Sequence, residues 1–324
     1  MDSGLENVVA AETTLSDVKG DIGELIIKGW HVEKLAASMA YEDVAHLLWQ
    51  NAFVDVPAPQ ELGERLGKAR ADVFRRLSLP DSQTSTIQAL RMGWATEQDD
   101  ESLETAITLA SGGFVYVAAA VRQSQGLSPI APDPTLSSSA DYLRMITGQA
   151  PQAAKARALD AYLVTICDHG LNASTFAARV VSSTRAGLTS AVLGGVSALK
   201  GPLHGGAPGP VLDMLDDIGE VSHAETWIDA ALARGDRLMG FGHRVYRARD
   251  PRADALKSAA SRLPGTAGRI AFAEHIEREV LGKLRQKYPT RPLATKVEFY
   301  TAILLEALDI PREAFTSVFA CGRV

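Results

Sequence analysis

Apolar residues recur at helical spacing along most of the chain. In three segments they fall three or four positions apart with polar or charged residues between them, namely Tyr41 to Leu48, Leu159 to Ile166 and Ile270 to Val280. Alanine is frequent while Val, Ile and Thr rarely run together, which favours helix over strand. We therefore predict a mostly helical protein in which these segments are helices that face the core.

Two segments depart from this pattern. Residues 23–30 are short, rich in β-branched side chains and bracketed by glycines, which predicts a small strand or hairpin. The longest uncharged stretch, Thr105 to Val121, is shorter than the roughly 20 residues that a membrane span needs and carries two glycines at its middle. We interpret it as a buried helix and expect no membrane span.

Glycine and proline are concentrated in three segments, residues 125–139, 201–210 and 288–292, which we expect to be irregular. The second of these suggests a division of the chain into two units. We predict a large helical domain of residues 1–203, to which residues 305–324 return, and a smaller domain of residues 204–304 that carries catalytic and ligand-binding groups.

Composition and charge narrow the class of protein. The 324 residues include 33 Lys and Arg against 39 Asp and Glu, a formal net charge of −6, and 46% are hydrophobic, as in a soluble globular protein. The acidic balance without a long block of like charge argues against nucleic acid or an anionic membrane as the main partner. The two cysteines form no CxxC pair and the amino terminus lacks a secretory or transit pattern, so we expect a reducing, cytoplasmic location.

Three of the seven histidines stand beside glycines: His169 precedes Gly170, His204 precedes Gly205, and His243 follows Gly242. Glycines let the main chain approach a ligand and present amide donors to it. An ordinary tight turn is the alternative for each segment. A metal site is a further alternative, but no HxxxH, HxH or HExxH spacing occurs. We expect surface or packing roles for the other four, His31, His46, His223 and His275.

An arginine-rich segment follows His243 and comprises Arg244, Arg247, Arg249 and Arg252. The planar guanidinium group binds a carboxylate or phosphate at two points, so the cluster indicates an anionic small molecule; a solvated loop of mixed charge is the alternative. Pro251 restricts Asp250 to extended geometry and would help to fix Arg252.

A single glutamate stands in an apolar context near the carboxyl end. Glu298 lies between Val297 and Phe299-Tyr300. An apolar setting raises the pKa of a carboxyl group by desolvation and can make it a competent base. The alternative is a glutamate that stabilises a helix N-terminus.

Together these segments resemble the citrate synthase family. The matching motifs follow the family's order: DHGLNASTF at 168–176, KGPLHGGA at 200–207, GFGHRVY and then DPR within 240–252, VEFY at 297–300 and GRV at 322–324. The opening segment GLENVVAAETTLSDVKGDIGELIIKGWHVEKLA is also similar to the family's, so the likeness spans essentially the whole chain. It implies an all-α, two-domain fold with a minor amino-terminal β hairpin, a homodimer, and a cleft that closes over its substrates.

The resemblance also implies an activity, the condensation of acetyl-CoA with oxaloacetate and water to citrate and CoA at the entry to the tricarboxylic acid cycle. His204 would hydrogen-bond the thioester oxygen while Glu298 removes a methyl proton, and His243 would polarise the ketone of oxaloacetate. A base aligned with a weak carbon acid and a donor on the developing oxyanion are what such chemistry needs. The enzyme would be an acyltransferase that converts the acyl group to an alkyl group on transfer.

Binding roles follow from the same resemblance. His169, Arg252 and Arg323 would bind the oxaloacetate carboxylates. Arg247 and the turn at Gly205 would face CoA. The resemblance implies no metal and no permanently bound cofactor, with acetyl-CoA as co-substrate.

The sequence departs from the family at two places. The family's base is usually Asp in Asn-Val-Asp, whereas Lys296-Val297-Glu298 stands here, and a neighbouring lysine favours an ionised carboxylate. Family chains normally continue past Gly-Arg-Val into a helical segment with another substrate-binding arginine that reaches across the dimer, whereas this sequence stops at Val324. If it is the whole protein, we expect weaker condensation and an altered dimer interface.

Two alternative functions remain open at this point. A 2-methylcitrate synthase has the same motifs and uses propionyl-CoA, and one methylene gives only about 1–3 kcal/mol of discrimination. A non-catalytic homologue would bind CoA or a dicarboxylate, or serve only as a dimerisation partner.

Overall fold

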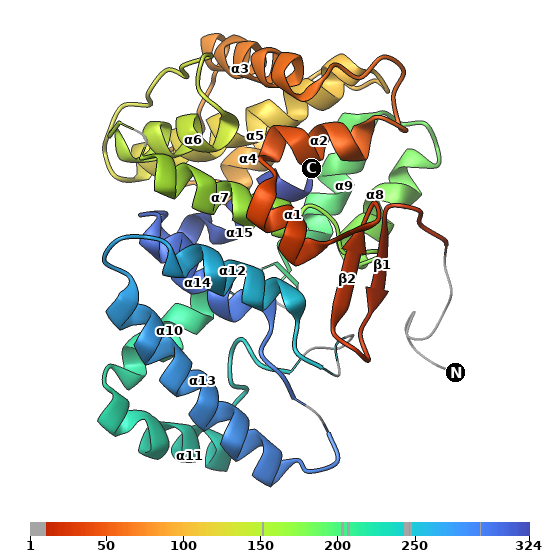
Figure 1. Ribbon diagram of the computed structural model, residues 1–324. Coiled ribbons are helices and arrows are strands. Elements are labelled where there is room, and N and C mark those ends of the chain that lie inside the picture. Colours follow the sequence, from red (N-terminus) through yellow and green to blue (C-terminus); the bar gives the residue numbers. More distant parts are fainter. Residues whose placement is uncertain are drawn as a thin grey trace.

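The structure is a computed structural model that describes residues 11–150, 152–201, 204–205, 208–242, 246, 248–291 and 293–324. The described residues are predominantly helical, which confirms the all-α fold class (Figure 1). The first nine helices are α1 (Val32–Ser38), α2 (Tyr41–Trp49), α3 (Pro59–Arg75), α4 (Thr86–Trp94), α5 (Leu103–Ser124), α6 (Ser138–Thr147), α7 (Ala153–Ile166), α8 (Ala173–Ser182) and α9 (Leu188–Leu199). They are followed by α10 (Pro208–Ile218), α11 (Ala224–Arg234), α12 (Pro251–Ser261), α13 (Ala267–Lys287), α14 (Val297–Ala307) and α15 (Phe315–Arg323).

The predicted hairpin is confirmed and belongs to a small antiparallel sheet. Strand β1 (Ser16–Lys19) pairs with β2 (Glu24–Ile27), which pairs with β3 (Trp30–His31). The β1–β2 turn lies against the arginine-rich segment: a Cβ added to Gly23 would come within 2.5 Å of the Arg249 carbonyl oxygen. The sheet therefore supports a segment that was singled out for its chemistry.

Helix α5 confirms the prediction of a buried helix at the uncharged stretch. The expectation that this helix is too short to span a membrane was wrong. The helix is 22 residues long, which makes it the one described helix long and apolar enough to cross a membrane. Within the protein 89% of its most apolar window is buried, as in a core helix. The helix extends beyond the uncharged stretch at both ends, because charged and polar residues there also adopt the helical conformation. Ser102 caps the start of the helix by accepting a hydrogen bond from the Thr105 amide at 3.1 Å.

The elements form two groups in space (Figure 1). Helices α1 to α9 lie together and α15 returns to them, packing against α5 and α7. Helices α10, α11 and α13 lie at the opposite end, with α12 and α14 between the two groups. The irregular segment was predicted to reach residue 210, but helix α10 already begins at Pro208. Proline is accommodated at the first position of a helix because the amide hydrogen that it lacks would have no helical partner there. The boundary between residues 203 and 204 stays a prediction.

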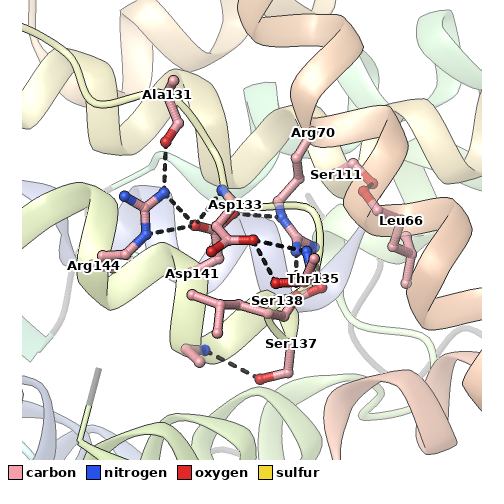
Figure 2. Close-up of polar contacts among 12 residues, drawn as sticks. Leu66, Arg70, Ser111, Ala131, Asp133, Thr135, Ser137, Ser138, Asp141 and Arg144 are labelled. Carbon is pink, nitrogen blue, oxygen red and sulfur yellow. Dashed lines mark hydrogen bonds and ion pairs between the residues drawn. The ribbon is translucent and has the colours of Figure 1, made fainter. Parts of the chain in front are cut away.

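The long loop before α6 is held in place by a buried ion pair (Figure 2). The side chain of Arg70 on α3 is fully buried, and its Nε donates to Asp141 Oδ2 at 2.9 Å. Its two terminal nitrogens donate to Ser138 Oγ at 2.8 Å and to the Leu136 carbonyl at 2.7 Å. The Asp133 amide donates to Asp141 Oδ1 at 3.0 Å, so the proline-rich loop is tied to both α3 and α6.

Candidate active site

The segment between α7 and α8 carries His169 and is ordered by the cap of α8. Asn172 Oδ1 accepts hydrogen bonds from the amides of Ser174 and Thr175, each at 3.1 Å. Asp168 accepts from the Gly170 amide at 3.0 Å and from the Ser16 hydroxyl of β1. His169 Nε2 lies 3.1 Å from the Tyr246 hydroxyl. These local turns aim the imidazole of His169 toward the segment that holds Tyr246.

His204 lies in the turn after α9 and contacts the start of α8. Its Nε2 is 2.9 Å from Ser174 Oγ, and that hydroxyl lies 2.7 Å from Asn172 Oδ1. Burial, aided by the charge of Arg323, lowers the pKa of His204 below its ordinary value of 6.5. The imidazole is therefore neutral at neutral pH, the state in which it can serve as a hydrogen-bond donor rather than a fixed cation.

Arg323, in the last turn of α15, is a partly desolvated cation near the same histidine. Its Nε donates to the Ile166 carbonyl at the end of α7, and its guanidinium stacks over the Phe319 ring at 4.9 Å. Burial lowers the pKa of Arg323 to about 10, with Asp168 opposing the shift and Arg252 adding to it. The group remains charged at neutral pH, and a bound anion would offset its desolvation.

Arg252 is held by the carboxylate of Asp250. Burial alone would lower the pKa of Arg252, but Asp250 outweighs it and the pKa is raised. Arg252 Nε and Nη2 donate to the two oxygens of Asp250 at 3.0 and 2.8 Å, and the Arg252 amide donates to Oδ1 at 3.1 Å. Asp250 also caps α12, whose first residue is Pro251. The expectation that this dipeptide fixes Arg252 is confirmed, although the carboxylate does so more directly than the proline.

Glu298 lies in the first turn of α14, and Asp250 contacts the residue that precedes it. Asp250 Oδ2 accepts from the Val297 amide at 3.1 Å, so one carboxylate holds both Arg252 and the residue before Glu298. Glu298 Oε2 is buried and has no hydrogen-bond partner among the described residues. A buried carboxylate oxygen without a partner is costly, which is typical of a functional position. The charges of Glu298 and Arg252 interact, as do those of Glu298 and Lys296.

Sequence reasoning missed Ser174 and the carboxylate role of Asp250. The signal for Asp250 was present, since Asp followed by Pro is a typical helix start. For Ser174 the only signal was its place after Asn172, which predicts a cap but not a contact with His204.

The close packing of Gly205 has a structural reason. A Cβ at this position would come within 2.6 Å of the Leu199 carbonyl oxygen, which already accepts from the Gly205 amide at 2.8 Å. The role of Gly205 toward CoA stays a prediction. His243 and Arg247 lie outside the described residues, so their roles also stay predictions.

An apolar cavity of about 360 Å³ adjoins these groups without containing the proposed reacting residues. Side chains of α2, α7, α9 and α15 line most of it, and Asp168, Ser174 and Arg323 supply polar atoms. His204, Arg252 and Glu298 do not line it. Across the ranges that the structure describes, no group of three or more His, Cys, Asp or Glu side chains is placed to hold a metal ion.

The geometry defines a class of protein: a helical protein that places a neutral imidazole, one buried and one half-buried guanidinium group, and a carboxylate at the junction of two groups of helices. Residues 4–324 match the family model for the citrate synthase C-terminal domain. The chain belongs to the citrate synthase family and is a transferase of the citrate synthase type.

Several relatives have similar sequences over most or nearly all of the chain. "Putative citrate synthase 2" of Mycobacterium tuberculosis H37Rv is 35% identical over 329 residues, covering 99% of this chain and 85% of the relative. The citrate synthase of Haloferax volcanii is 36% identical over 350 residues, covering 99% and 88%. A 2-methylcitrate synthase of M. tuberculosis Erdman is 36% identical over 276 residues, covering 80% and 69%.

Solved structures share the fold. The crystal structure of citrate synthase from Thermotoga maritima has a TM-score of 0.86 at 30% identity and covers 100% of this chain and 88% of that one. Citrate synthase of Thermoplasma acidophilum in a ternary complex with carboxymethyl coenzyme A and oxaloacetate has a TM-score of 0.86 at 23% identity, covering 100% and 89%. These likenesses confirm the two-domain citrate synthase-like fold class.

Proposed function

We propose that this chain condenses acetyl-CoA with oxaloacetate and water to give citrate and CoA. The observation that carries the proposal is the placement of buried Arg252, half-buried Arg323, neutral His204 and Glu298 around one junction. A dianionic ketoacid needs cationic partners, and the carbon acid needs a base and an oxyanion donor. The similarity to relatives named citrate synthase, and to a citrate synthase solved with carboxymethyl coenzyme A and oxaloacetate, adds support.

In the proposed mechanism each residue has one role. Arg252, Arg323 and His169 bind the carboxylates of oxaloacetate. Glu298 removes a proton from the methyl group of acetyl-CoA, and its unpartnered oxygen suits that role because no hydrogen bond from the described residues competes for it.

His204 stabilises the enolate oxygen that forms. In the structure the Ser174 hydroxyl donates its single proton to Asn172 Oδ1 at 2.7 Å. When the hydroxyl turns that proton to His204 Nε2, 2.9 Å away, the neutral imidazole carries its own proton on Nδ1 and can donate it to the thioester oxygen. The enolate then attacks the ketone, which His243 polarises, and water hydrolyses the citryl thioester. Arg247 and Gly205 face CoA. The reaction needs no metal and no resident cofactor, and we propose that the protein works as a cytoplasmic homodimer.

A second candidate function, 2-methylcitrate synthesis, differs from the first in the acyl-CoA that the enzyme prefers. The 36% identity to a protein named 2-methylcitrate synthase supports propionyl-CoA as the alternative substrate of this chain. We expect kcat/KM to be higher for acetyl-CoA than for propionyl-CoA, measured as CoA release with saturating oxaloacetate. A large preference for propionyl-CoA would overturn the citrate assignment in favour of 2-methylcitrate. Absence of CoA release with either thioester would favour a non-catalytic binding homologue.

A further inference from the structure

A buried glutamate on α13 contacts both segments that carry the proposed catalytic groups. Glu277 is only 5% exposed. Its Oε1 accepts from Thr295 Oγ1 at 2.5 Å and from Arg249 Nη1 at 2.6 Å, and its Oε2 accepts from the Tyr300 hydroxyl at 2.7 Å. Thr295 and Tyr300 stand on either side of Glu298 in the chain, and Arg249 directly precedes Asp250.

The electrostatics keep this carboxylate charged. Burial would raise the pKa of Glu277, but the hydrogen bonds from Thr295 and Tyr300 and the charge of Arg249 outweigh it and lower the pKa. Arg249 Nε also donates to Asp254 of α12 at 2.6 Å. A buried anion with three donors from two segments is satisfied only while those segments keep their positions.

Two of the three donors to Glu277, Arg249 and Thr295, lie outside the helices and the sheet, whereas Tyr300 lies on α14. The chain before α14 is held by isolated backbone bonds, from the Gly242 amide to the Ala294 carbonyl at 2.8 Å and from the Lys296 amide to the Gly240 carbonyl at 2.9 Å. Phe241 and Thr295 form an isolated β-bridge. The Asp250 amide also donates to the Thr295 carbonyl at 3.4 Å, which joins this stretch to the Arg252 segment. Because these backbone bonds are few, side-chain contacts contribute to how firmly the stretch is placed.

We propose that Glu277 is a positioning residue that fixes Glu298 relative to Arg252 by holding Thr295, Tyr300 and Arg249 at once. Glu277 touches neither substrate in this account; Asp250 links Arg252 to the Val297 amide directly, and Glu277 braces the same two segments from α13. The proposal rests on the proposed function, because it assigns the base to Glu298 and a substrate carboxylate to Arg252.

The test compares Glu277→Gln with Glu274→Gln. Both remove one negative charge from α13, but Glu274 pairs with Lys257 at 2.7 Å and its side chain is 36% exposed. We expect Glu277→Gln to lower kcat about 10- to 100-fold, as misplacement by about 1 Å does, with little change in the KM for oxaloacetate because Asp250 still holds Arg252. Glu274→Gln should leave both constants unchanged.

Hydrogen exchange gives a second readout that needs no turnover. We expect Glu277→Gln to speed amide exchange selectively in peptides covering residues 248–252 and 293–301, while the control matches the wild type. Tyr300→Phe removes one donor and should change the 293–301 peptide and kcat in the same direction by less, which keeps the test open if Glu277→Gln does not fold.

The outcomes separate the two proposals. Unchanged exchange in both segments, exchange that rises evenly along the chain, or a KM effect without a kcat effect would overturn the positioning role. If the folded wild-type protein releases no CoA, the proposed function fails, and the exchange measurement alone decides whether Glu277 holds the two segments.

Discussion

At the scale of single residues, the proposed chemistry depends on a neutral His204. Its pKa is lowered by burial and by the charge of Arg323. Folding therefore favours the neutral imidazole, and this contribution to stability is present above pH 6.5 and lost as the pH falls from that value through the lowered folded pKa. The Ser174 hydroxyl, 2.9 Å away, accepts from the neutral ring while its own proton lies on the bond to Asn172 Oδ1, and it donates to the ring only when that proton turns.

A pH profile tests this state of His204. We expect kcat to show no inflection from His204 above pH 6.5 and to fall as the pH drops through its lowered pKa. An imidazolium has no free nitrogen to accept the proton that the Ser174 hydroxyl must turn toward it in the reactive arrangement. The profile is measured with saturating substrates. The His204→Gln variant serves as the comparison, because the fall in kcat caused by protonation of His204 should be absent in it. An acidic limb with a midpoint above pH 7 would contradict the assignment.

At the scale of elements, helical periodicity predicted α2, α7 and α13, and the glycine-bracketed apolar run predicted the hairpin. The uncharged stretch underestimates the length of α5, because the Ser102 cap sets where the helix begins and polar residues continue the helix beyond the apolar ones. Contacts of high sequence separation, such as that of Arg70 with Asp141, were not predictable because neither residue carries a local signal for the other.

Two glycines one turn apart in α3 give an element-scale prediction. A Cβ at Gly67 would overlap the carbonyl of Pro134, which lies in the proline-rich loop before α6. A Cβ at Gly63 would meet only Glu42 Cγ, at 3.5 Å. Gly63→Ala should stabilise the protein by up to about 1 kcal/mol through helix propensity. Gly67→Ala should destabilise it by about 1–3 kcal/mol because the loop must move.

Denaturant unfolding of the two variants measures this difference. If Gly67→Ala were as stable as Gly63→Ala, the packing of residue 134 against α3 would be wrong.

At the scale of the whole molecule, the candidate site joins residues that are distant in the sequence. His169, His204, Arg252, Glu298 and Arg323 were selected from motifs and resemblance, and the structure brings four of them into electrostatic contact: His204 with Arg323, Arg323 with Arg252, and Arg252 with Glu298. The residues that hold them also make long-range contacts that no local pattern predicts, such as that of Asp250 with the Val297 amide and that of Glu277 with the Tyr300 hydroxyl.

The central claim is that Glu298 is the base of an oxaloacetate-dependent condensation, and CoA release by wild type and Glu298→Gln tests it most directly. We expect oxaloacetate-dependent release by the wild type and a loss of at least about 100-fold in kcat for Glu298→Gln, with oxaloacetate affinity retained by calorimetry. Glu306→Gln on the same helix, whose carboxylate binds Arg269 at 2.9 Å, should keep normal turnover. Near-normal turnover by Glu298→Gln, or no release by the folded wild type, would contradict the account.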